Sequence, residues 1–76
     1  MNSQAEFIRI AFRQARFEVL SDDGTHYGDI PICKGVYANA ETLEGCRREL
    51  REVLEEWTIF RLQRNLPLPD IRAFRS

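Results

Sequence analysis

The chain has 76 residues, so we expect one small domain that buries only about 60% of the surface of its unfolded chain. Eleven basic and twelve acidic residues give a net charge of -1, which disfavours non-specific binding to DNA or RNA. Without an apolar run near the roughly 18 residues of a membrane span, and without a leader-like N-terminus, we expect a cytoplasmic protein that makes no membrane contact. The cysteines, Cys33 and Cys46, form no metal-ligand motif, and reduced thiols are the simplest interpretation.

Residues 4–14 are predicted to form a helix. Ser3 and Glu6 fit a capping box, and apolar side chains recur on one helical face: Phe7, Ile8, Ala11 and Ala15. The same segment also alternates apolar and basic side chains, as a strand does. We favour the helix because of the cap.

Three short strands are predicted next, over residues 16–20, 26–30 and 36–38. Asp and Gly residues at 21–24 favour a turn between the first two strands. Pro31 closes the second strand and Gly35 marks the next turn. The pattern indicates an antiparallel meander.

A long amphipathic helix is expected from the N-cap Thr42 to about Arg64, with Asn65 as its terminator. Its predicted core face has three- and four-residue spacing and comprises Leu43, Cys46, Leu50, Val53, Leu54, Trp57 and Phe60. After Pro67 and Pro69, residues 70–74 alternate in character and suggest a last strand at the edge of the sheet.

Apolar residues outside the core stripe raise the question of assembly. Ile59 lies about opposite Leu50 on the helical wheel, and Leu62 is also well off the stripe. Either the N-terminal helix or a second subunit could cover them. We expect a homo-oligomer, a dimer or higher, with an interface that includes Phe7, Ile8, Ile59 and Leu62.

Residues whose side chains could carry chemistry have simpler structural roles. His26 lacks a Cys or Ser partner in a catalytic context, and a surface role is expected. Asp22, Asp23 and Asp29 could hold Mg²⁺ across a hairpin, but Asp22 and Asp23 are better understood as turn formers. The sequence predicts no catalytic residue, cofactor or metal site.

The order of motifs from Arg16 to Asp70 resembles the HicB-like antitoxin family. The matching residues are Tyr27, Gly28, Ile30, Pro31, Gly35, Val36, Ala38, Thr42, Leu43, Cys46, Leu50, Leu54, Trp57 and Pro67 to Pro69. The resemblance covers roughly three quarters of the chain, giving a HicB-like domain at 16–76 after a helical extension at 1–15. The chain departs from the family pattern at Lys34, at Asn39 and Ala40, and at Gly45.

The resemblance implies an α+β fold of the β-β-β-α-β type, partly RNase H-like, here with an extra N-terminal helix. It also implies a non-enzymatic antitoxin of a type II toxin-antitoxin system. Such a protein neutralises a HicA-like toxin, a small basic protein that cleaves mRNA, by covering its catalytic histidine and RNA surface. Many members carry a C-terminal DNA-binding segment. This chain ends soon after the predicted last strand, so no direct DNA binding is expected.

The predicted toxin-binding surface is the meander, with Tyr27, Asp29, Lys34 and Tyr37 as contact residues. The slight acidity of the chain suits a basic partner. Two other functions remain open: an orphan structural or regulatory oligomer without a toxin partner, and a Mg²⁺-dependent nuclease using the three aspartates.

Overall fold

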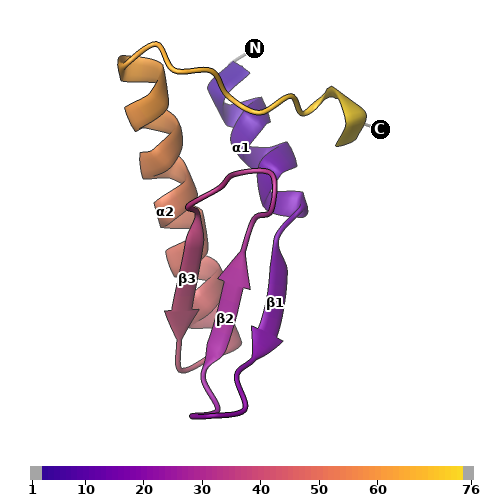
Figure 1. The fold of residues 1–76 in the computed structure, drawn as a ribbon, viewed down its shortest axis with the longest axis vertical. Helices are drawn as coiled ribbons and strands as arrows, with labels where there is room; N and C mark the ends of the chain where they lie inside the picture. The colour runs from indigo at the N-terminus through magenta and orange to yellow at the C-terminus, as the bar shows by residue number, and fades with distance from the viewer. Residues whose placement is uncertain (1–2, 75–76) are drawn as a thin grey trace.

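The computed structural model describes residues 3–74 as a three-stranded sheet with two helices (Figure 1). Its elements are, in order, α1 (Ser3–Arg13), β1 (Arg16–Val19), β2 (His26–Asp29), β3 (Tyr37–Ala40), α2 (Leu43–Gln63) and the short 3-10 helix η1 (Arg72–Phe74). The expected N-terminal helix, antiparallel meander and long second helix are therefore confirmed. The side chain of Ser3, the proposed cap, lies outside the described part of the chain.

The sheet has the order β1-β2-β3, and both neighbouring pairs are antiparallel. Gly28 sits at its centre, opposite Phe17 on β1 and Ala38 on β3. The turns on either side of β2 use glycines at positive φ, Gly24 at 74° and Gly35 at 96°. Both were expected at turns from the sequence.

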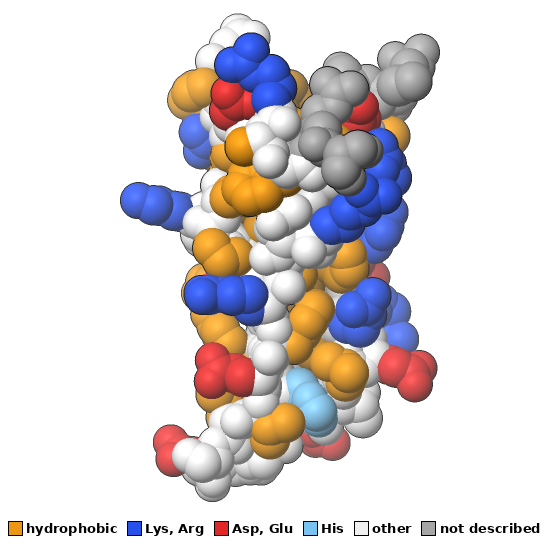
Figure 2. Space-filling view, turned by 90° about the vertical axis from the view of Figure 1, so that its right-hand side faces the viewer, with side chains coloured by type: hydrophobic (Ala, Val, Ile, Leu, Met, Phe, Trp, Pro, Cys, Tyr) orange, Lys and Arg blue, Asp and Glu red, His pale blue; other side chains and the backbone are white. Residues whose placement is uncertain are grey.

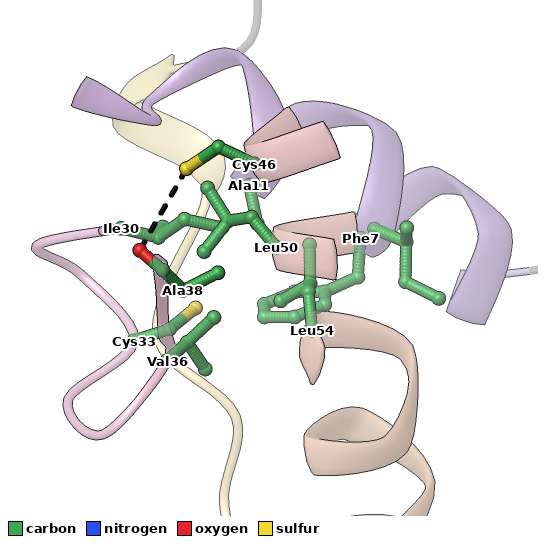
Figure 3. Packing of buried hydrophobic residues seen from close by; sticks show 10 residues of the cluster. Phe7, Ala11, Ile30, Cys33, Val36, Ala38, Cys46, Leu50 and Leu54 are labelled. Atoms are coloured by element: carbon green, nitrogen blue, oxygen red, sulfur yellow. Dashed lines mark hydrogen bonds between the residues drawn. The ribbon is translucent and has the colours of Figure 1, made fainter. Parts of the chain in front are cut away.

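The hydrophobic core lies between the sheet and the helices. Leu50 and Leu54 of α2 pack against Ile30, Val36 and other buried residues around the sheet, and α1 adds Phe7, Ile8 and Ala11 to the same cluster (Figure 3). Cys46, also from α2, is fully buried, and its Sγ lies 3.7 Å from the carbonyl oxygen of Ala38. The N-terminal segment is thus part of the core.

Helix α2 begins and ends with recognisable capping geometry. Thr42 is extended, and its hydroxyl accepts a hydrogen bond from the Gly45 N–H at 3.0 Å. At the other end, Asn65 adopts a positive φ of 57°, and the Leu66 N–H donates to the Arg61 carbonyl at 2.8 Å. This helix end turns the chain back toward α1.

Two residues of the predicted core stripe are exposed, Leu43 at 44% and Phe60 at 48%. The cause is the direction of the buried stripe on α2. The fully buried residues recur every four positions, at Cys46, Leu50, Leu54 and Thr58, so the stripe passes Thr58 and leaves Phe60 to one side. Leu43 is the first residue of the helix and lies before this stripe begins.

The expected strand at residues 70–74 is wrong. The Asp70 carboxylate accepts hydrogen bonds from the backbone N–H of Arg72 at 2.9 Å and from its guanidinium. The Phe74 N–H then donates to the Ile71 carbonyl at 3.0 Å, which closes the turn of η1. These local bonds compete with strand pairing, and the segment runs past the helices instead of joining the sheet (Figure 1).

None of the helices within the described residues is long and apolar enough to cross a membrane.

Candidate protein-binding surface

The sheet has one face turned away from α2, which we call the outer face. Its side chains follow from the period of two along each strand and from the strand register. They form two rows across the sheet: Arg16, Asp29 and Tyr37 in one, and Glu18, Tyr27 and Asn39 in the other. None of the six is buried, so no described element covers this face.

Contacts between neighbouring strands order the outer face. The rings of Tyr27 and Tyr37 lie diagonally across β2 and β3, with centroids 6.4 Å apart and planes inclined by 24°. Arg16 Nη2 lies 3.3 Å from Asp29 Oδ2, which joins β1 to β2. The aromatic and charged groups are thereby held in place on a hydrogen-bonded sheet.

Tyr27 keeps its phenolic proton in this setting. Burial raises its pKa, and the carboxylate of Asp29 raises it further. The hydroxyl therefore remains a hydrogen-bond donor throughout the physiological range. This chemistry suits recognition by polar contacts.

The four predicted toxin-contact residues lie together. Tyr27, Asp29, Lys34 and Tyr37 line one hollow of about 250 Å³ between the end of the sheet and the loop 30–36. The loop is closed by its own backbone, because the Ile30 N–H donates to the Val36 carbonyl at 3.2 Å. Lys34 is exposed on this loop, at the margin of the outer face.

The four residues of the predicted oligomer interface do not lie on one surface. Phe7 and Ile8 are in the core, only 3% and 7% exposed. Their apolar face packs against α2, so they are not available to a partner, and that part of the expected interface needs correction. Ile59 and Leu62 are 42% and 43% exposed, so α1 does not cover them.

The three aspartates of the nuclease hypothesis are separated. Asp23 is a turn former, since its carboxylate accepts from the Thr25 hydroxyl at 2.7 Å and from the Thr25 N–H at 2.9 Å. These hydrogen bonds lower the pKa of Asp23. Asp29 lies at the far end of β2 and pairs with Arg16. No group of three potential metal ligands occurs within residues 3–74.

The two thiols are buried and form no disulfide. Burial raises the pKa of Cys33 to about 11, although the positive charge of Arg61 acts in the opposite direction. Burial also raises the pKa of Cys46. Both side chains are therefore neutral core groups at physiological pH.

Sequence reasoning missed two features next to these residues. Arg16 was not selected, although antiparallel pairing across the 21–24 turn would have placed it opposite Asp29. The second feature is a hollow in which Trp57 and Arg61 meet Pro67, Leu68 and Pro69. Trp57 was expected to be a core anchor, but it is only partly buried. The proline-rich segment after the helix end was the available signal.

The model of the family described as UPF0150-like matches residues 6–69, which span α1 through the start of the C-terminal segment. The crystal structure of TTHA0281 from Thermus thermophilus superimposes with a TM-score of 0.88 at 32% sequence identity, covering 100% of this chain and 94% of that one. The search of curated proteins gives no match.

Proposed function

The chain belongs to the UPF0150-like family, and from this premise we propose that it is a non-enzymatic, antitoxin-like binding protein of a type II toxin-antitoxin system. Its partner is a HicA-like mRNA interferase, which it neutralises by occlusion. The outer face of the sheet, with Tyr27, Asp29 and Tyr37, is the contact surface, and Lys34 lies at its margin.

The observation that carries this proposal is the uncovered outer face. A three-stranded sheet with helix packing on one side leaves its other side to solvent or to a partner. Tyrosine and arginine are enriched where proteins bind one another, and this face holds Tyr27, Tyr37 and Arg16. A stacked tyrosine pair supplies contact area that loses little conformational freedom on binding.

The order of elements and the net charge also support the proposal. The β1-β2-β3-α2 order matches the first four elements of the β-β-β-α-β arrangement that the HicB-like resemblance implies, although the last strand is replaced by η1. We assign the sheet and α2 to a partial RNase H-like layer. A net charge of -1 allows approach to a basic toxin, whereas a strongly basic chain would repel it.

A growth-rescue assay tests the proposal. A HicA-like toxin from the same host is expressed with this protein, and growth is compared with that of cells expressing the toxin alone. We expect the wild-type protein to restore growth. The double variant Tyr27→Ala/Asp29→Asn should fail, because it removes the central ring and one charge from the outer face.

The matched control changes the same kinds of group elsewhere. Phe60→Ala/Glu52→Gln removes an exposed aromatic ring and a carboxylate from α2 and should rescue growth as the wild type does. Circular dichroism must show the same helix content in all three proteins. Full rescue by Tyr27→Ala/Asp29→Asn would contradict the assignment of the outer face.

A second candidate function is a structural or regulatory homo-oligomer without a toxin partner. It is favoured by the exposed apolar end of α2, where Ile59, Phe60 and Leu62 are each more than 40% exposed. In that case Ile59→Asp/Leu62→Asp should convert the assembly to monomers in multi-angle light scattering. An unchanged mass would exclude this surface as the interface.

A further inference from the structure

A second groove lies next to Lys34, separate from the hollow at the end of the sheet, and we call it the tail groove. It lies between the C-terminal half of α2, the loop 30–36 and the segment 67–69. Its volume is about 440 Å³, within the range of about 300 to 1,000 Å³ usual for binding pockets. Figure 1 shows the C-terminal segment leaving the end of α2 and running back past the top of α1.

Specific contacts hold the tail groove open. After the positive-φ residue Asn65, the chain reverses, and Arg61 Nε donates to the Pro67 carbonyl at 2.9 Å. Leu68 packs against the core cluster. Two prolines, Pro67 and Pro69, restrict the backbone of the segment between these anchors. The groove is thus preformed, which reduces the entropy lost on binding.

The charged side chains that line the tail groove are all positive among the described residues. Lys34 and Arg61 line it, and no acidic side chain is among the described residues that do so. Within residues 3–74, the ion pairs of the structure do not involve Lys34. The nearby Asp70 is engaged elsewhere, since its carboxylate lies 2.8 Å from Arg72 Nη2. An anionic group placed here would meet two cations.

The remaining lining is apolar and centres on Trp57. Its ring stacks on Phe7 with centroids 6.5 Å apart, and the Arg61 guanidinium carbon lies 5.0 Å from the ring centroid. Ile32 and Leu68 complete the apolar surface. Trp57 is therefore fixed in position, with part of its surface accessible from the groove.

From this combination we propose that the tail groove binds an acidic peptide segment of a partner protein, with an apolar side chain against Trp57 and carboxylates at Lys34 and Arg61. A peptide fits better than a small molecule because the groove is shallow and largely open to solvent, whereas small ligands are usually buried over most of their surface. This site is distinct from the outer face and does not depend on the toxin being the partner, although Lys34 borders both hollows.

The single tryptophan gives a direct measurement, because all tryptophan fluorescence comes from Trp57, which lines the groove. The probe is an acetylated, amidated hexapeptide of alternating glutamate and leucine, titrated into the full chain at low salt. We expect a saturable change in Trp57 emission that weakens as salt is added. The same peptide with lysine in place of glutamate should produce no change.

Three variants test whether the peptide binds in the tail groove and not elsewhere on the molecule. Lys34→Gln should weaken binding about two- to fivefold, the range for one partly exposed ion pair. Arg64→Gln removes the same charge near the end of α2 but outside the groove lining, and should leave the affinity unchanged. Tyr27→Ala/Asp29→Asn alters the outer face and should also bind the peptide normally, so failure of the toxin proposal would not affect this result.

Several outcomes would overturn the proposal. They are the absence of a Trp57 signal, equal binding of the lysine peptide, and equal losses for Lys34→Gln and Arg64→Gln. Binding of hexanoate as tightly as the peptide would assign the groove to small organic acids instead. A Trp57 signal that changes with protein concentration alone would assign it to a second copy of the chain.

Discussion

Gly28 is the position where the packing of the sheet against α2 can be tested most directly. A Cβ atom placed on Gly28 would lie 2.7 Å from two ring carbons of Phe17 and 3.2 Å from the Sγ of Cys46. The Arg47 guanidinium lies 5.6 Å from the centre of the Phe17 ring, so a shift of the ring would also disturb this contact. Gly28→Ala should therefore strain both the β1–β2 pair and the contact with α2.

The magnitude follows from two opposing effects. Overpacking a core site costs about 1–3 kcal/mol, whereas replacing glycine with alanine restricts the unfolded chain and recovers about 0.4–1 kcal/mol. The net loss for Gly28→Ala should be about 1–2 kcal/mol. For a domain of this size, that corresponds to a Tm lower by about 5–15 °C in calorimetry.

Two controls make the test specific. Gly45→Ala, in the first turn of α2, should change stability less than Gly28→Ala, because the better helix propensity of alanine, about 1 kcal/mol, opposes the crowding of the capping Thr42 Oγ1, which would lie 3.0 Å from the new Cβ. In a Phe17→Ala background, Gly28→Ala should destabilise much less, because the ring is gone and only the 3.2 Å contact with the Cys46 Sγ remains. A Tm for Gly28→Ala equal to or above the wild-type value would refute the packing described for the sheet centre.

Two further predictions concern α2 and the buried thiols. Thr42→Ala removes the acceptor for the Gly45 N–H and should cost about 1 kcal/mol in urea unfolding, whereas Thr42→Asp should retain most of the stability. The raised pKa of Cys33, about 11 against an ordinary value near 9, means that the unfolded chain loses its thiol proton first as pH rises. Stability should accordingly fall between about pH 9 and 11, and a Cys33→Ala variant should show a smaller fall. Native protein at about pH 8, below the ordinary thiol pKa, should not react with a thiol reagent, and rapid labelling of Cys33 under those conditions would contradict its burial.

Local signals in the sequence predicted most of the elements. Thr42 marks the start of α2, and glycines mark the turns on both sides of β2 because those positions need a positive φ. Helical spacing identified the fully buried residues Cys46, Leu50 and Leu54. Each of these features is determined by residues that are close together in the sequence, so each can be predicted from the sequence alone.

Features that depend on the lengths and positions of whole elements were not predicted. Leu43 and Phe60 have core spacing, but the fully buried stripe of α2 begins at Cys46 and ends at Thr58, and it leaves both residues exposed. Residues 70–74 alternate like a strand, yet the Asp70 side chain bonds the backbone of Arg72 and favours η1. Periodicity cannot reveal which competing local hydrogen bonds form or where the sheet ends.

The outer face also combines features that the sequence predicts with features that depend on how whole elements are placed. Period-two alternation placed Tyr27, Asp29 and Tyr37 on strands, but only the register puts them on one face with Arg16. The uncovered state of that face depends on α1 and the C-terminal segment, which no local pattern positions. Figure 2 views the molecule from the side and shows acidic, basic and apolar side chains interspersed on that side. This mixture agrees with the net charge of -1. It also explains why composition alone does not identify a binding site.

The proposed function requires the outer face to bind a small basic toxin. The most direct measurement is a pull-down of tagged protein from its own host at native expression level, carried out in parallel with the Tyr27→Ala/Asp29→Asn variant and followed by mass spectrometry. We expect a HicA-like protein to co-elute with the wild type and to be lost with the variant. Recovery of only further copies of the chain, or equal recovery of the partner by the variant, would contradict it.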